Sequence, residues 1–175
     1  MTKTPISLQE LRRRIYRKAK SETTHRFWGL FVHVTKMETL EEAYRIAKGN
    51  GGAPGIDGQS FRDIESAGRA AFLAAVREDL VTGRYKPMPN RPVEIPKGNG
   101  KFRTLQIPTI YDPVCQQALL NRLEPIFEPV FDEANFGYRR GRSTKDAMRK
   151  VWKELQSGRE WIVDADLKDF LDTSS

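Results

Sequence analysis

The feature that most restricts the fold is a stretch of extended chain in the middle of a sequence that otherwise favours helices. The segment 85–92 contains three prolines, and proline lacks the backbone N–H that a helix interior needs. Two short runs that favour strands follow, at 93–95 and 102–107. The segment 97–100 separates them, and its Asn-Gly pair is a strong hairpin signal. The sequence therefore predicts an α+β fold in which one hairpin interrupts a series of helices.

Apolar residues at helical spacing predict helices before and after this hairpin. The expected ranges are 7–20, 39–48, 61–82 and 143–156, with one more helix that opens at Asp112-Pro113 and has Asp112 as its cap. Ser7, Thr39 and Ser143 each stand three residues before an acid, which is the spacing of a capping box. The residues expected in the core are Leu40, Ala43, Tyr44, Ala47, Phe72, Leu73, Val76, Leu80, Ala118, Leu119, Leu123, Ile126, Ala147, Val151 and Leu155.

Near the end of the sequence, an apolar run carries two carboxylates. The segment Trp161–Leu167 reads as a strand, and the i, i+2 spacing of Asp164 and Asp166 places both on one face of it. Such a pair could bind Mg²⁺, a cation that prefers a few carboxylates together with phosphate oxygens. From the spacing alone, a structural role for these acids is the alternative. A lone strand also needs neighbouring strands, and no further strand follows in these residues.

The charge of the chain is positive and unevenly distributed. Lys and Arg number 30 against 23 Asp and Glu, which gives a formal net charge of +7. Six cations accompany one anion between residues 84 and 104, seven accompany one anion between 139 and 153, and the first predicted helix is also basic. These clusters favour an anionic partner, nucleic acid before membrane, because Lys and Arg pair with phosphates. A solvated surface is the alternative interpretation of each cluster.

Composition excludes several other classes of protein. No apolar run approaches the roughly 20 residues that span a bilayer, and the N-terminus lacks the apolar stretch of a secretory signal. Cys115 is the single cysteine, which excludes an internal disulfide and a cysteine-based zinc site. We therefore expect a soluble, intracellular protein of the cytoplasm without a membrane partner.

Five blocks of sequence, taken in order, resemble those of group II intron-encoded reverse transcriptases. Any one block is a weak signal, but the ordered set is highly specific. The blocks are GGAPGIDG at 51–58, IPK followed by GKFRTLQIP within 95–108, QQAL and LEPIFE within 116–128, NFGYRRGRS at 135–143, and DADLKDF at 164–170.

The resemblance implies a right-hand polymerase of which this chain holds the fingers and the first palm strand, so that the fold is incomplete. Residues 1–37 would be a basic N-terminal helical extension, 38–160 the fingers, and 161–175 the start of the palm. The implied reaction is RNA-templated addition of deoxynucleotides to a primer. The implied partners are group II intron RNA, or an RNA template with a DNA primer, and dNTPs. The family also implies a bacterial cytoplasm as the location.

Roles for particular residues follow from the resemblance as well. Lys97 and Arg103 match positions that contact the incoming triphosphate, where cations neutralise developing charge. Asp166 matches the first catalytic aspartate, which binds Mg²⁺ together with the backbone carbonyl of Leu167. Asp164 precedes that position and is expected to be structural.

The segment 135–143 contributes to the implied template site. The resemblance implies that Arg139 and Arg142 of this block face the template strand. Phe136 and Tyr138 flank the same turn, where stacking on unpaired bases is one interpretation and core packing the other.

The sequence departs from the family pattern at four positions. Gln106 stands where the family usually has Gly, Pro113 where it often has Arg, and Arg140 where Pro is common. Leu171 stands five residues after Asp166, at a position that is usually aromatic and blocks the ribose 2′-hydroxyl. The resemblance therefore does not imply that this chain discriminates against ribonucleotides.

Two-metal phosphoryl transfer needs carboxylates on both sides of the metal pair. The family takes the others from a later palm strand, which these 175 residues lack together with the thumb and maturase regions. We therefore expect a fragment that does not polymerise by itself. One alternative is a non-catalytic remnant that binds intron RNA, and another is an unrelated basic RNA-binding protein whose motif matches arose by chance.

Overall fold

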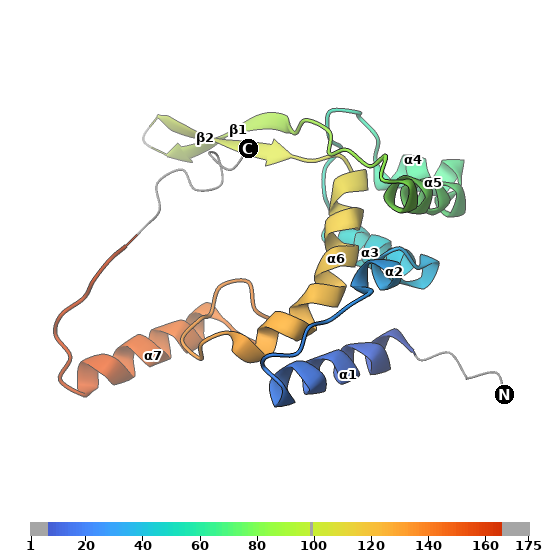
Figure 1. The fold of residues 1–175 in the computed structure, drawn as a ribbon. Helices are drawn as coiled ribbons and strands as arrows, with labels where there is room; N and C mark the ends of the chain where they lie inside the picture. The colour runs from blue at the N-terminus through green and yellow to red at the C-terminus, as the bar shows by residue number, and fades with distance from the viewer. Residues whose placement is uncertain (1–6, 99, 166–175) are drawn as a thin grey trace. The chain divides into compact units, whose positions relative to one another are not determined.

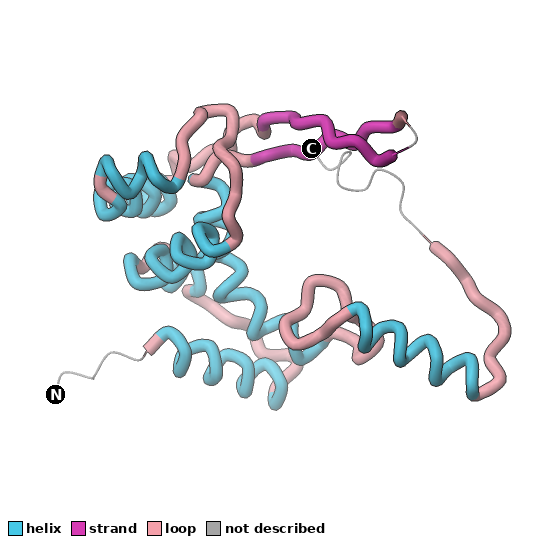
Figure 2. The backbone as a smooth tube through the Cα atoms, turned by 180° about the vertical axis from the view of Figure 1, so that it is seen from behind, coloured by secondary structure: helices cyan, strands magenta, loops and turns pink. Residues whose placement is uncertain are grey.

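The computed structural model describes residues 7–98 and 100–165 (Figure 1). The chain divides into two compact units, Met1–Val130 and Phe131–Ser175. Strand structure in the described ranges is confined to one two-stranded sheet, as Figure 2 shows from behind. The elements are α1 (Leu8–Ser21), α2 (Leu30–Val34), α3 (Met37–Gly49), α4 (Phe61–Ala67), α5 (Arg69–Thr82), β1 (Arg91–Gly98), β2 (Lys101–Ile107), α6 (Tyr111–Phe127), the 3₁₀ turn η1 (Glu128–Val130) and α7 (Thr144–Gln156).

The first unit contains the hydrophobic core. Helix α6 packs against α1, α2 and α3, and α5 closes the core from the side of α3. The expected stripes on α3 and α5 are confirmed, because their central residues are buried and Phe72 and Leu80 pack against them. The buried apolar residues of this core are Val34, Leu40, Ala43, Tyr44, Ala47, Ile64, Leu73, Val76, Ile110, Val114, Cys115 and Ala118.

The buried face of α6 differs from the one expected. Ala118 is fully buried, but Leu119 is 46% exposed, so the expectation for Leu119 is wrong. The buried face instead continues through Asn121 and Arg122, which lie one turn beyond Ala118 and two turns beyond Val114. A stripe defined by apolar residues alone misses this face, because polar side chains complete it.

The single helix expected at 61–82 is two helices. Gly68 separates α4 from α5 with φ of 112° and ψ of 95°, a conformation that favours glycine. Ser60 caps α4 through a capping box with Asp63, in which each residue bonds the backbone N–H of the other. The apolar periodicity continues across the break, which is why the pattern alone does not reveal it.

Helix starts follow the expected caps only in part. The Ser7 hydroxyl accepts a hydrogen bond from the Glu10 N–H at 3.2 Å, as expected. Thr39 is not a cap: α3 begins at Met37, and the Thr39 hydroxyl donates to the His33 carbonyl at 2.8 Å. Asp112 also lies inside the first turn of its helix. A hydroxyl or carboxylate near a helix start can bond to groups outside the helix, and spacing does not reveal which bond forms.

The expected hairpin is confirmed, with longer strands. Strands β1 and β2 pair antiparallel, so that Val93 lies opposite Leu105 and Ile95 opposite Arg103. The register shifts between Pro96 and Gly98, close to the turn. Helices with one two-stranded sheet give the mixed helix and strand fold that the sequence predicts.

In the second unit, α7 begins with a complete capping box between Ser143 and Asp146, as expected. Its expected core stripe is wrong for the described chain, because no residue of α7 is buried and Val151 and Leu155 are exposed. An apolar stripe shows that a helix is amphipathic and does not show what covers it.

The acidic segment after α7 does not form the expected strand over its described part. Residues 161–165 adopt no regular structure, and Trp161, Ile162 and Val163 are exposed. No described strand pairs with them, and a strand without a neighbour leaves its backbone groups without ladder hydrogen bonds. Asp166 and Leu167 lie outside the described residues.

Candidate nucleic-acid interface

Lys97 and Arg103 lie on the same hairpin. Arg103 on β2 is paired with Ile95, and Lys97 on β1 stands at the register shift between Pro96 and Gly98, so the two residues lie on neighbouring strands close to the hairpin turn. Both side chains are exposed. Within the described residues, neither forms a hydrogen bond or an ion pair. Two exposed donors on neighbouring strands can bind an anion without first breaking an internal bond.

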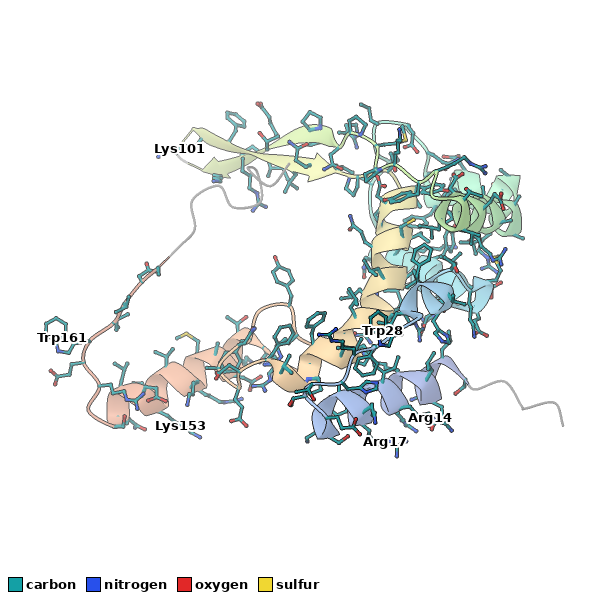
Figure 3. All side chains as sticks on the ribbon, viewed as in Figure 1. Arg14, Arg17, Trp28, Lys101, Lys153 and Trp161 are labelled. Atoms are coloured by element: carbon teal, nitrogen blue, oxygen red, sulfur yellow. The ribbon has the colours of Figure 1, made fainter. Side chains whose placement is uncertain are left out.

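The other cations between residues 84 and 104 divide into two groups. Arg84 pairs with Glu78 and Asp79 on α5, and Arg91 binds inside the fold, so these two support the structure. Lys86 and Lys101 are exposed and have no ion pair within the described ranges. Figure 3 labels Lys101 beside the hairpin turn. The free cations of this cluster are therefore concentrated toward the outer part of the hairpin.

The base of the hairpin is tied to the glycine-rich segment 51–58. The Arg91 Nε and Nη2 atoms both donate to the Pro54 carbonyl, at 3.0 and 2.8 Å. The next residue, Gly55, is buried, and a Cβ atom there would lie 2.6 Å from the Thr109 Cα. The glycine is thus required by close backbone approach. This contact fixes the loop against the chain that leaves β2.

A buried carboxylate holds the extended segment that precedes β1. Asp112 is 4% exposed, and it accepts hydrogen bonds from the Tyr85 hydroxyl at 2.6 Å and the Thr109 hydroxyl at 3.0 Å. Burial, and then the bond to Asp112, raises the pKa of Tyr85. The network joins the chain before β1 to the start of α6, so both ends of the hairpin are anchored.

Tyr111 extends this anchor to α5. Its hydroxyl donates to the Asp79 carboxylate at 2.7 Å, and its ring stacks on Tyr85 with centroids 5.8 Å apart. Burial, followed by the bond to Asp79, raises the pKa of Tyr111. The sequence analysis did not single out Tyr85, Tyr111 or Asp112 as partners, because they are distant in sequence.

Arg122 is a buried cation of α6 that the apolar pattern of the sequence does not predict. Its side chain is 2% exposed, and its Nη2 atom lies 3.9 Å from a Glu42 carboxylate oxygen. The Nε and Nη1 atoms have no hydrogen-bond partner among the described residues. Burial lowers the pKa of the guanidinium, while Glu42 opposes that shift. This arginine joins α6 to α3, and its position on the stripe of Val114 and Ala118 was the available signal.

The expected template arginines lie in the segment 131–143, which we call the 131–143 loop. The Arg139 Nη1 atom donates to the Asp132 and Asn135 carbonyls at 2.7 and 2.8 Å, and the guanidinium lies 5.4 Å from the Phe131 ring centre. The Arg142 side chain is held in the same way. Its Nη1 atom donates to a backbone carbonyl at 2.7 Å, and its guanidinium lies over the Phe136 ring at 5.5 Å. Both arginines therefore shape the loop.

Helix α1 presents a basic surface on one side and packs on the other. Arg12 faces α6, where it forms an ion pair with Glu124 at 2.7 Å. Arg14 and Arg17 lie on the side turned away from α6 (Figure 3). A shallow surface depression is lined by Arg14, Arg17, Lys18, Lys20 and Ser21. The charge of this surface suits phosphates.

The described residues contain no cluster of side chains that forms a metal-binding site. They contain no group of three or more His, Cys, Asp or Glu side chains that could ligate one. Asp164 is exposed and outside any strand, and the predicted ligands Asp166 and Leu167 lie beyond the described part of the chain. Binding of Mg²⁺ therefore stays a prediction for Asp166 and Leu167.

Comparison with known proteins gives the class. Residues 95–173 match the model of the family described as reverse transcriptase (RNA-dependent DNA polymerase). Protein YkfC of Escherichia coli (strain K12) is 36% identical over 172 residues, which are 95% of this chain and 45% of that protein. Group II intron-encoded protein LtrA of Lactococcus lactis subsp. cremoris is 31% identical over 162 residues, or 91% of this chain and 26% of LtrA.

A yeast protein matches over a shorter range. The putative COX1/OXI3 intron 1 protein of Saccharomyces cerevisiae is 31% identical over 104 residues, or 59% of this chain and 12% of that protein. Residues 95–173 are thus reverse transcriptase-family sequence, and more particularly the chain is homologous to group II intron-encoded proteins. The resemblance recognised from the sequence is confirmed. The chain spans less than half the length of these curated relatives.

None of the described helices combines the length and the apolar character needed to cross a bilayer.

Proposed function

We propose that this chain supplies the fingers, and the start of the palm, of a group II intron reverse transcriptase. The observation that carries the proposal is the anchored hairpin, which carries Lys97 and Arg103 as exposed cations on neighbouring strands close to its turn. A lysine and an arginine on a rigid support suit a triphosphate, because charge-assisted hydrogen bonds to phosphate oxygens are strong and directional. In this proposal both residues bind the phosphates of the incoming dNTP.

The remaining roles follow from the homology to group II intron-encoded proteins. Asp166 is the catalytic aspartate, and its carboxylate, with the Leu167 carbonyl, would hold Mg²⁺. When bound, the ion would neutralise charge on the reacting phosphates. Residues 1–37 form a basic extension, 38–160 the fingers and 161–175 the first part of the palm. The proposed setting is a bacterial cytoplasm.

The proposed nucleic-acid partners are group II intron RNA, or an RNA template with a DNA primer. Arg139 and Arg142 belong to the template side of this proposal. Because their Nη1 atoms bind loop carbonyls, their main contribution is to hold the 131–143 loop in shape beside the template. The remaining N–H groups of the Arg142 guanidinium can reach phosphates.

We further propose that these 175 residues do not polymerise by themselves, because Asp166 alone cannot supply carboxylates on both sides of a metal pair. The test is a primer-extension assay with RNA template, DNA primer, dNTPs and Mg²⁺. We expect no extension above a blank without protein. Template-dependent incorporation that disappears in Asp166→Asn would contradict this proposal.

A non-catalytic RNA-binding role is the second candidate, and the basic surface of α1 favours it. Arg13 and Lys20 have no ion pair within the described residues, so each is available to a phosphate. The test is the affinity for single-stranded RNA as a function of salt. Replacing both residues by Ala should make the slope of log K against log[salt] shallower by about 1.4, because each phosphate contact contributes about 0.7. The matched control is Arg77→Ala on α5, and an affinity that does not depend on salt would exclude this role.

A further inference from the structure

Tyr138 combines three features that do not fit a role in folding. It is the one residue other than glycine with positive φ in the described chain, at 54°. Its ring is wholly exposed. It forms no hydrogen bond or ring contact with any described residue. A bulky residue in the left-handed region is strained, and Gly or Asn would fit such a turn better. The ring therefore serves something outside the folded chain.

The backbone around Tyr138 is held firmly in spite of this strain. Arg139 and Arg142, which follow Tyr138 in the same loop, bind the carbonyls of Asp132, Asn135 and Glu133 as described above. Their guanidinium groups also lie over two aromatic rings of the loop. These contacts fix the loop without using the Tyr138 ring, so the ring is presented to solvent from a rigid support.

The charge around the ring identifies the kind of molecule that it would meet. Between residues 131 and 154, seven cations outnumber the four acids Asp132, Glu133, Asp146 and Glu154. Lys145 and Lys153 have no ion pair within the described residues, and Figure 3 labels Lys153 on α7. A cationic surface attracts a phosphate backbone, and an exposed aromatic ring offers a face on which a base can stack.

We propose that Tyr138 is a stacking residue for an unpaired base of a single-stranded nucleic acid, with the 131–143 loop as its rigid support. The inference rests on the proposed function in that it takes the partner to be a nucleic acid. It deepens that function by naming one residue and the part of the strand that it contacts. A folded protein partner is the competing occupant, and it would not depend on the presence of bases.

The test compares two end-labelled oligonucleotides of equal length, one of deoxythymidylate and one of abasic tetrahydrofuran sites. Both carry the phosphate charge, but only the first has bases. Tyr138→Asn removes the ring and retains a residue that tolerates positive φ. Tyr138→Phe keeps a ring that can stack. Trp161→Ala is the matched control, because Trp161 is an exposed aromatic residue outside the loop.

Stacking predicts that Tyr138→Asn weakens binding of the thymidylate oligomer by about 5- to 100-fold, the effect of losing one base-stacking residue. Affinity for the abasic oligomer should stay within about twofold. Tyr138→Phe and Trp161→Ala should both bind the thymidylate oligomer like the unmodified chain. Circular dichroism of each variant checks that α7 remains folded.

Two different results would overturn the inference. If the unmodified chain binds both oligomers and Tyr138→Asn weakens neither, or weakens both equally, the ring does not stack on a base, while nucleic-acid binding still stands. If the unmodified chain binds neither oligomer at low salt, the proposed function itself fails, and the stacking role fails with it.

Discussion

Gly55 lies where two segments of backbone meet. A Cβ atom at this position would lie 2.6 Å from both the Thr109 Cα and the Thr109 N, and 2.8 Å from the Pro108 carbonyl oxygen. Backbone atoms cannot move aside as a flexible side chain can. We therefore expect Gly55→Ala to lower the free energy of unfolding by about 1–3 kcal/mol, as overpacking does.

Urea denaturation followed by circular dichroism measures this effect. The matched control is Gly52→Ala in the same segment, because a Cβ there meets nothing within 4 Å and φ is not positive. That variant should stay within about 0.5 kcal/mol of the unmodified chain. Equal stability of the two variants would contradict the close approach at Gly55.

The buried thiol of Cys115 predicts a loss of stability at alkaline pH. Burial, with a smaller contribution from Asp112, raises the pKa of Cys115 from 9.0 to about 12. Between about pH 9 and 12 the thiol stays protonated in the folded state but ionises in the unfolded state. The contribution of Cys115 to the free energy of unfolding is therefore intact below pH 9 and is lost as the pH rises from about 9 toward 12. The slope cannot exceed about 1.4 kcal/mol per pH unit for one group.

Urea midpoints at pH 8, 9, 10 and 10.5 test this prediction. Cys115→Ala lacks the titrating group, so its stability should fall less steeply above pH 9 than that of the unmodified chain. The comparison separates Cys115 from Tyr44, whose pKa burial raises to about 12 and which both chains retain. Parallel curves for the two chains would show that Cys115 does not contribute.

At this scale the sequence predicted some residues well and others poorly. Leu40, Leu73 and Val76 were expected in the core and are fully buried, because apolar residues at helical spacing line the one face of a helix that packs against the core. Arg91 was counted among the exposed cations, but it binds the Pro54 carbonyl. The inward position of Arg91 depends on the Pro54 carbonyl, 37 positions away in the sequence. A local sequence pattern does not contain this contact.

Among the elements, α7 depends most on its own local interactions. No residue of this helix is buried, so its stability rests on the Ser143–Asp146 capping box and on pairs such as Lys150 with Glu154 at 2.8 Å. The bond from the Ser143 hydroxyl is the main cause of the lowered pKa of Asp146. Removing this cap should therefore have a clear local effect.

We expect Ser143→Ala to cost α7 about 1 kcal/mol, the usual value of an N-cap hydroxyl. Amide hydrogen exchange measures it residue by residue, and exchange in α7 should become about fivefold faster while α3 is unchanged. Thr144→Ala is the matched control at the next position. If exchange in α7 does not change in Ser143→Ala, the capping box does not support the helix.

The elements also show what a local pattern can and cannot predict. The hairpin was predicted correctly, because prolines and an Asn-Gly turn act on neighbouring residues. The break at Gly68 was missed, because apolar spacing continues through it. The strand at 161–167 depends on partner strands, and residues 161–165 adopt no regular structure in the described chain. Elements that depend on distant partners are the ones that the sequence predicted poorly.

For the whole molecule, the central claim is that the first unit presents a triphosphate-binding hairpin. The sequence predicted the pair Lys97 and Arg103 from the resemblance, and the antiparallel pairing places both close to the turn of one hairpin. It did not predict how the hairpin is anchored. Tyr85, Asp112 and Arg91 hold its base through contacts that span 27 to 37 positions, which only the folded structure brings together.

The most direct test is a titration of the chain with deoxyadenosine triphosphate, followed by NMR of the backbone amides. We predict shifts at residues 93–107, and no such shifts with adenosine. The double variant Lys97→Ala, Arg103→Ala should bind at least about tenfold more weakly, since each charge-assisted bond is worth about 1.5–3 kcal/mol. Arg77→Ala, an exposed cation on α5, should bind normally. Unchanged affinity in the double variant, or shifts confined to other residues, would contradict the account.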